Sequence, residues 1–155
     1  MNEKELLAKI MEKFPAVLES KPAAGALPAF NLTIDAPASS IAEICAWLKT
    51  GGLKFDYLAC LSGVDLKDKL LLIYHLYSME FKHKLILKTD LDRTKPELSS
   101  VATVWQAANW HEREAYDMFG IKFTGHPYLE RILTAEGFEG YPLLKDFIAK
   151  PDQYD

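Results

Sequence analysis

The chain has 155 residues, of which 49% are hydrophobic and 26% are charged, and its formal net charge is −4 at pH 7. This length and composition predict one globular domain with a buried core, and they exclude a disordered chain as the starting expectation. Acidic and basic residues are mixed along the whole chain, which argues against a nucleic-acid binder and against a polybasic contact with an anionic membrane.

The chain offers no segment of its own for crossing a membrane. The longest apolar run, residues 70–77, is too short to span a bilayer. The first ten residues, MNEKELLAKI, have neither the core of a signal peptide nor the Arg-rich character of a transit peptide. We therefore expect the chain to stay in the compartment where it is made and to meet a membrane only through a partner.

The only two cysteines, Cys45 and Cys60, lack the CxxC spacing of metal and redox motifs. This chain alone therefore cannot supply the four thiolates of an iron–sulfur cluster. We interpret both cysteines as buried and chemically inert side chains.

The N-terminal third predicts a helix, a strand and a second helix. Apolar side chains in residues 3–14 recur at helical spacing and stop at a proline. Residues 30–34, FNLTI, alternate apolar and polar side chains as a half-buried strand does. The second helix should start at Ser40, with a capping box formed by Ser40 and Glu43, and end before Gly51-Gly52. Its apolar stripe includes Cys45, which is therefore expected in the core.

Three strand-like runs follow without helices between them, at residues 55–61, 70–77 and 83–91. Their short connectors predict an antiparallel meander, because parallel pairing would need a long crossover. The expected fold is α+β, with a mostly antiparallel sheet, helices packed on one face, and an extended irregular C-terminal tail. We expect a globular domain over residues 1–120 and a partner-docking tail over residues 121–155, since the tail carries many large apolar residues but no regular periodicity.

Between the last strand and the tail, PELSSVATVWQAAN predicts a short helix or turn that starts near Ser99. The next run, NWHEREAYDMFG, predicts a helix with Asn109 as N-cap and Glu112 reaching back to the cap. Gly120 is well placed to end this helix in a left-handed turn.

The side chains of this helix suggest a metal site, an enzyme active site, or charges with a structural or docking role. His111, Glu114 and Asp117 stand three residues apart and could form a metal site with His126, but the chain has no HExxH or ExxH motif. It also lacks a nucleophile elbow, a GxGxxG loop and a P-loop, so a free-standing metal-dependent enzyme is the weakest hypothesis. Arg113 and Asp117 form either an exposed i,i+4 pair or charges that hold a partner or brace the first turn of the tail.

Two long runs in this region, ANWHEREAYDMFGIKFTGHPYLERIL and GFEGYPLLKDF, resemble the 30-kDa-type subunit of NADH:quinone oxidoreductase, respiratory complex I. The likeness continues upstream through YHLYS, HKLILK and SVATVWQAANW. Members of this family usually have Asp and then Leu-Arg-Arg after the His-Pro pair, where this chain has Tyr128 to Arg131. They usually have an arginine where Leu144 stands.

The resemblance implies a non-catalytic peripheral-arm subunit of a membrane-bound, proton-translocating complex that passes electrons from NADH to quinone. It implies no catalytic residue, cofactor or metal on this chain; iron–sulfur clusters, FMN and quinone are expected on partner subunits. The implied partners are the large quinone-site subunit of the 49-kDa type and neighbouring cluster-bearing subunits, with no nucleic acid. The implied location is peripheral, at the cytoplasmic face of a bacterial plasma membrane.

The alternative within this class is the equivalent subunit of an energy-converting hydrogenase or of another quinone-reducing complex. In either complex, the residues expected to dock onto a partner lie on the last helix and in the tail. They are His111, Glu112, Arg113, Glu114, Asp117, Gly120, Gly125, His126, Pro127, Arg131, Gly140, Pro142, Lys145 and Asp146.

Overall fold

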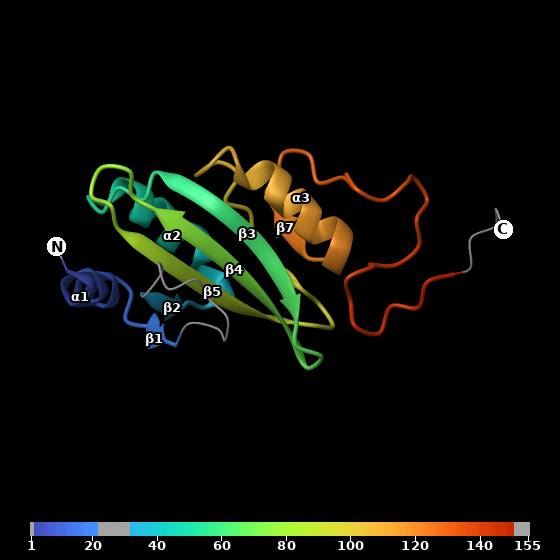
Figure 1. Cartoon of the computed structure of the whole chain (residues 1–155), viewed down its shortest axis with the longest axis horizontal. Helices are drawn as coiled ribbons and strands as arrows, with labels where there is room; N and C mark the ends of the chain where they lie inside the picture. Colours follow the sequence, from blue (N-terminus) through green and yellow to red (C-terminus); the bar gives the residue numbers. More distant parts are fainter. Residues whose placement is uncertain (1, 22–31, 151–155) are drawn as a thin grey trace.

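The computed structural model describes residues 2–21 and 32–150 (Figure 1). A five-stranded sheet forms its centre, with the strands in the order β1-β2-β5-β4-β3, and β6 and β7 make a small parallel pair beside it. The elements of the described residues are, in chain order, α1 (Glu3–Lys13), β1 (Leu18–Ser20), β2 (Thr33–Asp35), the 3-10 helix η1 (Ala38–Ser40), α2 (Ile41–Thr50), β3 (Tyr57–Asp65), β4 (Lys69–Tyr77), β5 (Lys84–Asp92), β6 (Glu97–Ser99), α3 (Ala108–Phe119) and β7 (Lys122–Thr124).

The three long strands form the predicted meander. β3 pairs antiparallel with β4, and β4 pairs antiparallel with β5. The short strand β2 joins the other side of β5 in parallel, and β1 pairs antiparallel with β2. The expectation of a mostly antiparallel sheet in an α+β fold is therefore confirmed.

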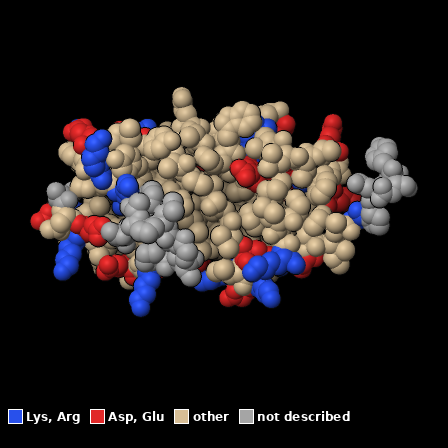
Figure 2. All heavy atoms as spheres, in the orientation of Figure 1, with Lys and Arg blue, Asp and Glu red and all other residues tan. Residues whose placement is uncertain are grey.

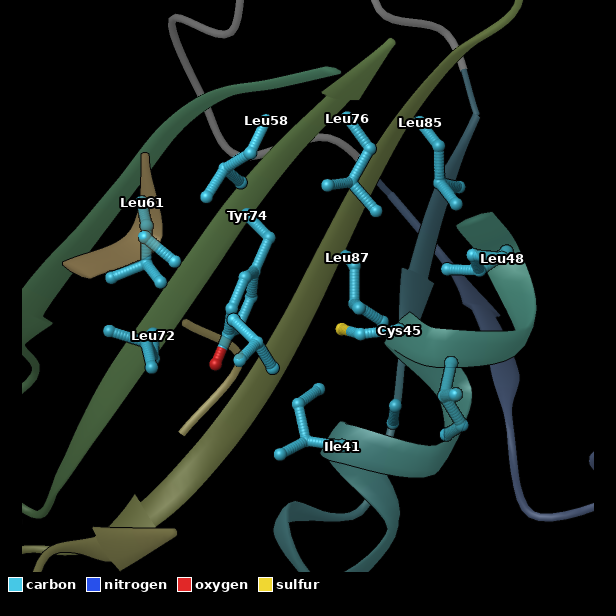
Figure 3. Close-up of a cluster of buried hydrophobic side chains, with 14 of the residues drawn as sticks. Ile41, Cys45, Leu48, Leu58, Leu61, Leu72, Tyr74, Leu76, Leu85 and Leu87 are labelled. Carbon is cyan, nitrogen blue, oxygen red and sulfur yellow. The ribbon is translucent and has the colours of Figure 1, made fainter. Parts of the chain in front are cut away.

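The hydrophobic core lies between this sheet and the helices. Along β4, every second side chain is fully buried, from Leu70 through Leu72 and Tyr74 to Leu76, as the two-residue period of a strand requires. Figure 3 shows side chains of β3, β4 and β5 converging on one face of α2. Burying an aliphatic side chain of this size contributes about 1.5–3 kcal/mol, so this layer is the main source of stability.

All three helices share this core. Leu6 and Ile10 of α1 and Ala115 and Met118 of α3 belong to the same buried cluster as the side chains of α2. The helices therefore cover one face of the sheet, as predicted. Figure 2 shows the surface in the orientation of Figure 1, with charged side chains of both signs dispersed around a broad uncharged area. This face presents no large patch of a single charge.

The predicted N-cap residue of α3 and the predicted capping box of α2 are wrong. α3 starts at Ala108 with Ala107 as N-cap and no side-chain capping bond, because the Glu112 side chain turns inward rather than back to Asn109. Ser40 is the N-cap of α2 as expected, but its side chain makes no capping bond, since η1 leads directly into the helix. A capping box is found instead at α1, where Asn2 and Glu5 form it.

Sequence patterns also missed the shortest strands. Residues 97–99 form β6, which was not predicted, because they pair with β7 over three residues; the turn predicted to start near Ser99 follows at residues 102–104. The predicted strand at 30–34 overlaps β2, but residues 30 and 31 lie outside the described part of the chain. Cys45 is fully buried as expected, whereas Cys60 is partly exposed on the sheet, which contradicts its predicted burial.

Candidate functional site

The candidate site consists of α3, β7 and the segment that follows it, residues 125–150, called the tail below. The tail leaves the body beside α3 and extends away from the end of the molecule that carries α1 (Figure 1). It contains no helix or strand in its described residues. Side chains of the body hold it at three points, in addition to the buried cluster around Glu112 described below.

The first fastening point is the Asp117 carboxylate at the C-terminal end of α3. It is fully buried. Asp117 Oδ2 accepts hydrogen bonds from three successive backbone N–H groups, those of Ile132 (3.1 Å), Leu133 (2.7 Å) and Thr134 (3.0 Å). Its Oδ1 accepts from Thr134 Oγ1 (2.5 Å) and pairs with Arg131 Nη1 (3.1 Å).

These contacts decide the ionisation of Asp117. Burial by itself would raise the pKa of this carboxyl, but the hydrogen bonds from Thr134, Leu133 and Ile132 lower it to about 2. The group is therefore a carboxylate at neutral pH, held by donors of the tail turn that it organises. Arg131 extends the same network, since its two Nη atoms donate to the Gly140 carbonyl at 3.1 and 3.0 Å.

The second fastening point is Arg113, one turn earlier on α3. Its Nε donates to the Glu130 carbonyl at 3.0 Å and its Nη2 to the Arg131 carbonyl at 3.5 Å. The guanidinium lies over the rings of Trp110 and Tyr128, at 5.0 and 5.2 Å from their centroids. Arg113 therefore bonds the tail backbone and does not form the i,i+4 pair with Asp117 that the spacing allowed.

The third fastening point lies on the sheet. Asp65 at the end of β3 is almost fully buried, and it accepts bonds from Arg93 Nε (3.2 Å), Arg93 Nη2 (3.0 Å) and the Lys145 backbone N–H (2.8 Å). Arg93 also pairs with Asp146 at 2.6 Å. The hydrogen bonds from Arg93 and from the Lys145 backbone hold the pKa of Asp65 well below its usual range. The carboxylates of Asp65 and Asp146 in turn raise the pKa of the Arg93 guanidinium above its usual value.

A buried polar cluster joins the start of the tail to the middle of α3. Glu112 is fully buried, and it accepts hydrogen bonds from Ser100 Oγ (2.5 Å) and the Val101 N–H (2.7 Å). The buried imidazole of His126 approaches it, with Nε2 at 3.9 Å from the carboxylate. Burial raises the pKa of Glu112 to about 7, although its bonds from Ser100 and Val101 oppose that rise.

Glycines allow the tail to approach the body. Gly120 ends α3 with φ 75°, the left-handed turn that was predicted, and a Cβ there would lie 2.6 Å from the Tyr141 ring. Gly140 has φ 87°, and a Cβ there would lie 3.1 Å from the Phe147 ring. Gly125 has φ 82° but open space around it. The first two positions need glycine for both backbone conformation and packing.

The remaining predicted site residues lie at or near the surface. Glu114, Gly125, Pro127, Lys145 and Asp146 have exposed side chains or backbones, and His111 and Pro142 are half-buried. Within the described residues, no group of three His, Cys, Asp or Glu side chains could hold a metal ion. His126 and Glu112 lie close together, but His111, Glu114 and Asp117 do not join them in one cluster.

Large apolar side chains of the tail and α3 point outward. Trp110 and Leu133 each expose 63% of their surface, Tyr128 56%, Leu143 53% and Ile148 86%. Polar and charged groups thus fasten the tail, while several of its largest apolar groups remain largely uncovered by the described part of the chain. Large aromatic and aliphatic side chains exposed to this extent are typical of a surface that another protein covers.

Sequence reasoning missed Asp65, Arg93, Ser100 and Thr134. Asp65 is 80 positions from Lys145, its tail partner, and no local pattern links them. Asp65 lies beyond the strand predicted at residues 55–61, so no strand pattern marked it. In the described residues, no helix is long and apolar enough to cross a membrane.

This chain is similar to known proteins both in sequence and in structure. A subunit of the NADH-quinone oxidoreductase of Rhizobium meliloti is 42% identical over 145 residues, covering 91% of this chain and 77% of that protein. A subunit of the F(420)H(2) dehydrogenase of Methanosarcina mazei is 34% identical over 156 residues, covering 99% of this chain and 96% of its own. The solved structure of a trypsin-resistant fragment of Nqo5 matches with a TM-score of 0.69 at 28% identity, covering 83% of this chain and 100% of the fragment.

The family described as the 30-kDa subunit of respiratory-chain NADH dehydrogenase matches residues 34–153. That match includes the long strands of the sheet, α3 and the tail with its three fastening points. The chain belongs to this family.

Proposed function

We propose that this chain is a non-catalytic subunit of a membrane-bound NADH:quinone oxidoreductase of the complex I type. In this proposal, residues 1–120 form the structural body and residues 121–155 dock onto the large quinone-site subunit and its cluster-bearing neighbours. NADH oxidation, electron transfer through FMN and iron–sulfur clusters, and quinone reduction belong to other chains. This chain lies peripherally in the complex, at the cytoplasmic face of the bacterial plasma membrane.

The observation that carries this proposal is the contrast between the two sides of the tail. Toward the body, the tail is held by Asp117, Arg113 and the Asp65–Arg93 pair. Away from the body, it presents Leu133, Leu143 and Ile148 to solvent. A segment that is ordered by contacts with the body and keeps several large apolar side chains exposed is suited to a preformed interface, because little conformational entropy is lost on docking.

Co-purification tests the proposal directly. The tagged chain is extracted with its membranes in mild detergent, and the proteins that accompany it are identified. Recovery with an NADH-binding subunit, cluster-bearing subunits and the large quinone-site subunit supports the proposal. Recovery of the chain alone, with none of these subunits, contradicts it.

A matched pair of variants then tests the tail itself. Leu133→Asp places a charge on an exposed tail residue, and Leu18→Asp makes the same change on β1, where the leucine is 61% exposed. We expect Leu133→Asp to reduce the recovered large subunit on the order of tenfold, since a buried uncompensated charge weakens an interface by at least that factor. Leu18→Asp should leave recovery unchanged. Equal recovery with both variants would remove the tail from the interface.

The relative from Methanosarcina mazei favours one alternative. The F(420)H(2) dehydrogenase subunit aligns over almost the full length of both chains, so the same body and tail could serve a complex with another electron input. Energy-converting hydrogenases and other quinone-reducing complexes are alternatives of the same kind. The electron-input subunit recovered in the co-purification distinguishes them.

A further inference from the structure

Glu112 is the one fully buried carboxyl of the described residues that no Lys or Arg side chain pairs with. Its partners are the Ser100 hydroxyl and the Val101 N–H, which lie in the turn after β6. A buried carboxylate without a cation loses its hydration and gains little in return. The stability of this site therefore depends on whether Glu112 is protonated or ionised.

The hydrogen bonds of His126 fix this imidazole in its neutral form. Nδ1 lies 3.0 Å from the backbone N–H of Tyr128, which can only donate, so Nδ1 must accept and carries no proton. Nε2 lies 3.1 Å from the Asn109 carbonyl, which can only accept, so Nε2 carries the proton. A second proton on His126 would break the bond from Tyr128. His126 therefore does not neutralise Glu112 while this network is intact.

Glu112 itself can take a proton without losing a partner. When it is ionised, its oxygens accept from Ser100 Oγ and the Val101 N–H. When it is protonated, its O–H can donate to Ser100 Oγ across the same 2.5 Å, while the Val101 bond stays. Ser100 Oγ also accepts the Ala102 N–H at 3.1 Å, so the turn after β6 depends on this pair of side chains.

The groups around Glu112 leave its charge uncompensated. Cys45 of α2 and Tyr74 of β4 are both fully buried, and burial raises the pKa of each, with the charge of Glu112 raising it further. Both side chains are therefore neutral at physiological pH. With His126 also neutral, these neighbours from the elements packed around Glu112 supply no positive charge.

We propose that Ser100, Glu112 and His126 form a proton-sensitive latch, closed when Glu112 is neutral and loosened when it ionises. The latch joins α3 to two segments, the turn at 100–102 and the turn at 125–128 that begins the tail. Ionisation draws water to the carboxylate, and water reaches it only if these turns move away from α3. The chain itself then responds to neutral-range pH, whether or not the tail docks as proposed above.

Hydrogen exchange on the full chain tests the latch. Exchange of the Val101, Ala102 and Tyr128 amides is measured at pH 6 and pH 8.5, corrected for the intrinsic pH dependence of exchange. We expect their protection to fall about tenfold or more at the higher pH, because one pH unit beyond a buried titration changes an opening equilibrium by that factor. Glu112→Gln, which cannot ionise, should abolish this fall. Glu114→Gln, the same change on the exposed side of α3, should leave it intact.

Two results would overturn the proposal. One is unchanged protection of the wild-type amides between the two pH values. The other is the same fall in Glu112→Gln. If Glu112→Gln does not fold, the wild-type chain still decides: carbon-13 labelling of its glutamate carboxyl groups reports the titration of Glu112. A midpoint near neutral pH supports the latch, and a midpoint in the ordinary glutamate range contradicts it.

Discussion

Three buried carboxylates of this chain illustrate how the surroundings of a side chain decide its charge. Asp117 and Asp65 are surrounded by N–H donors and an arginine, which favour the ionised form. Glu112 has two donors and no cation, so burial prevails. The first two therefore act as fixed negative charges that hold the tail, whereas the third can change its charge near neutral pH.

Among single side chains, we predict that Asp117 is the most important for the order of the tail. Asp117→Ala leaves the three backbone donors of residues 132–134 without their acceptor, and we expect a loss of about 1–3 kcal/mol of stability. Urea unfolding of the full chain measures it. Glu114→Ala, an exposed carboxylate on the same helix that makes no hydrogen bond or ion pair within the described residues, should cost less than about 0.5 kcal/mol. Equal losses would contradict this role.

The same residue gives a pH prediction. The pKa of Asp117 is lowered to about 2 in the folded chain, against about 3.9 for an unfolded aspartate, so its stabilising contribution is complete above pH 4. It is lost as the pH falls from about 4 to 2. Asp117→Asn should therefore show a shallower decline in thermal midpoint over that interval than the wild type. A parallel decline in both proteins would assign the acid sensitivity to other carboxyl groups.

At the scale of elements, α3 connects the body to the tail, and Gly120 sets the angle at which the chain leaves it. Gly120→Ala faces two costs, because φ is 75° and the new Cβ would lie 2.6 Å from the Tyr141 ring. Gly125→Ala faces only the first, of about 1–2 kcal/mol, since nothing lies within 4 Å of its Cβ position. We predict a larger drop in thermal midpoint for Gly120→Ala. Equal drops would show that the Tyr141 ring moves aside freely, and a larger drop for Gly125→Ala would contradict the prediction.

Local sequence patterns predicted the elements with strong periodicity and missed interactions between distant segments. The nine-residue strands and α3 carry enough alternating or helical positions to be recognised, and Gly120 marks its own left-handed turn. The three-residue strands β1, β6 and β7 were missed, since they are too short to show a period. Asp117 was recognised as a charge that could brace the tail, but its donors are backbone groups 15 to 17 positions away, which have no side-chain signature.

At the scale of the whole molecule, the tail is fastened to two different layers, the helix layer through Asp117 and the sheet through Arg93. Figure 1 shows the tail returning toward the sheet after it has left α3. The return is held by Asp65, whose nearly complete burial requires a cationic partner, and by Asp146 on the same arginine. The two layers therefore fix the tail as a loop closed at both ends.

We predict that breaking the contact between the tail and the sheet leaves the contact between the tail and α3 in place. Arg93→Ala removes the cation from Asp65 and Asp146, so residues 141–150 should detach while Asp117 still holds residues 131–134. Trypsin cleavage after Lys145 should accelerate on the order of tenfold in native buffer, whereas cleavage after Arg131 should not change. Lys69→Ala, which removes the exposed pair with Asp90 on the same sheet, controls for the loss of a surface charge. Acceleration at both tail sites would mean that the tail detaches as one unit, and the sheet and α3 would then hold it cooperatively.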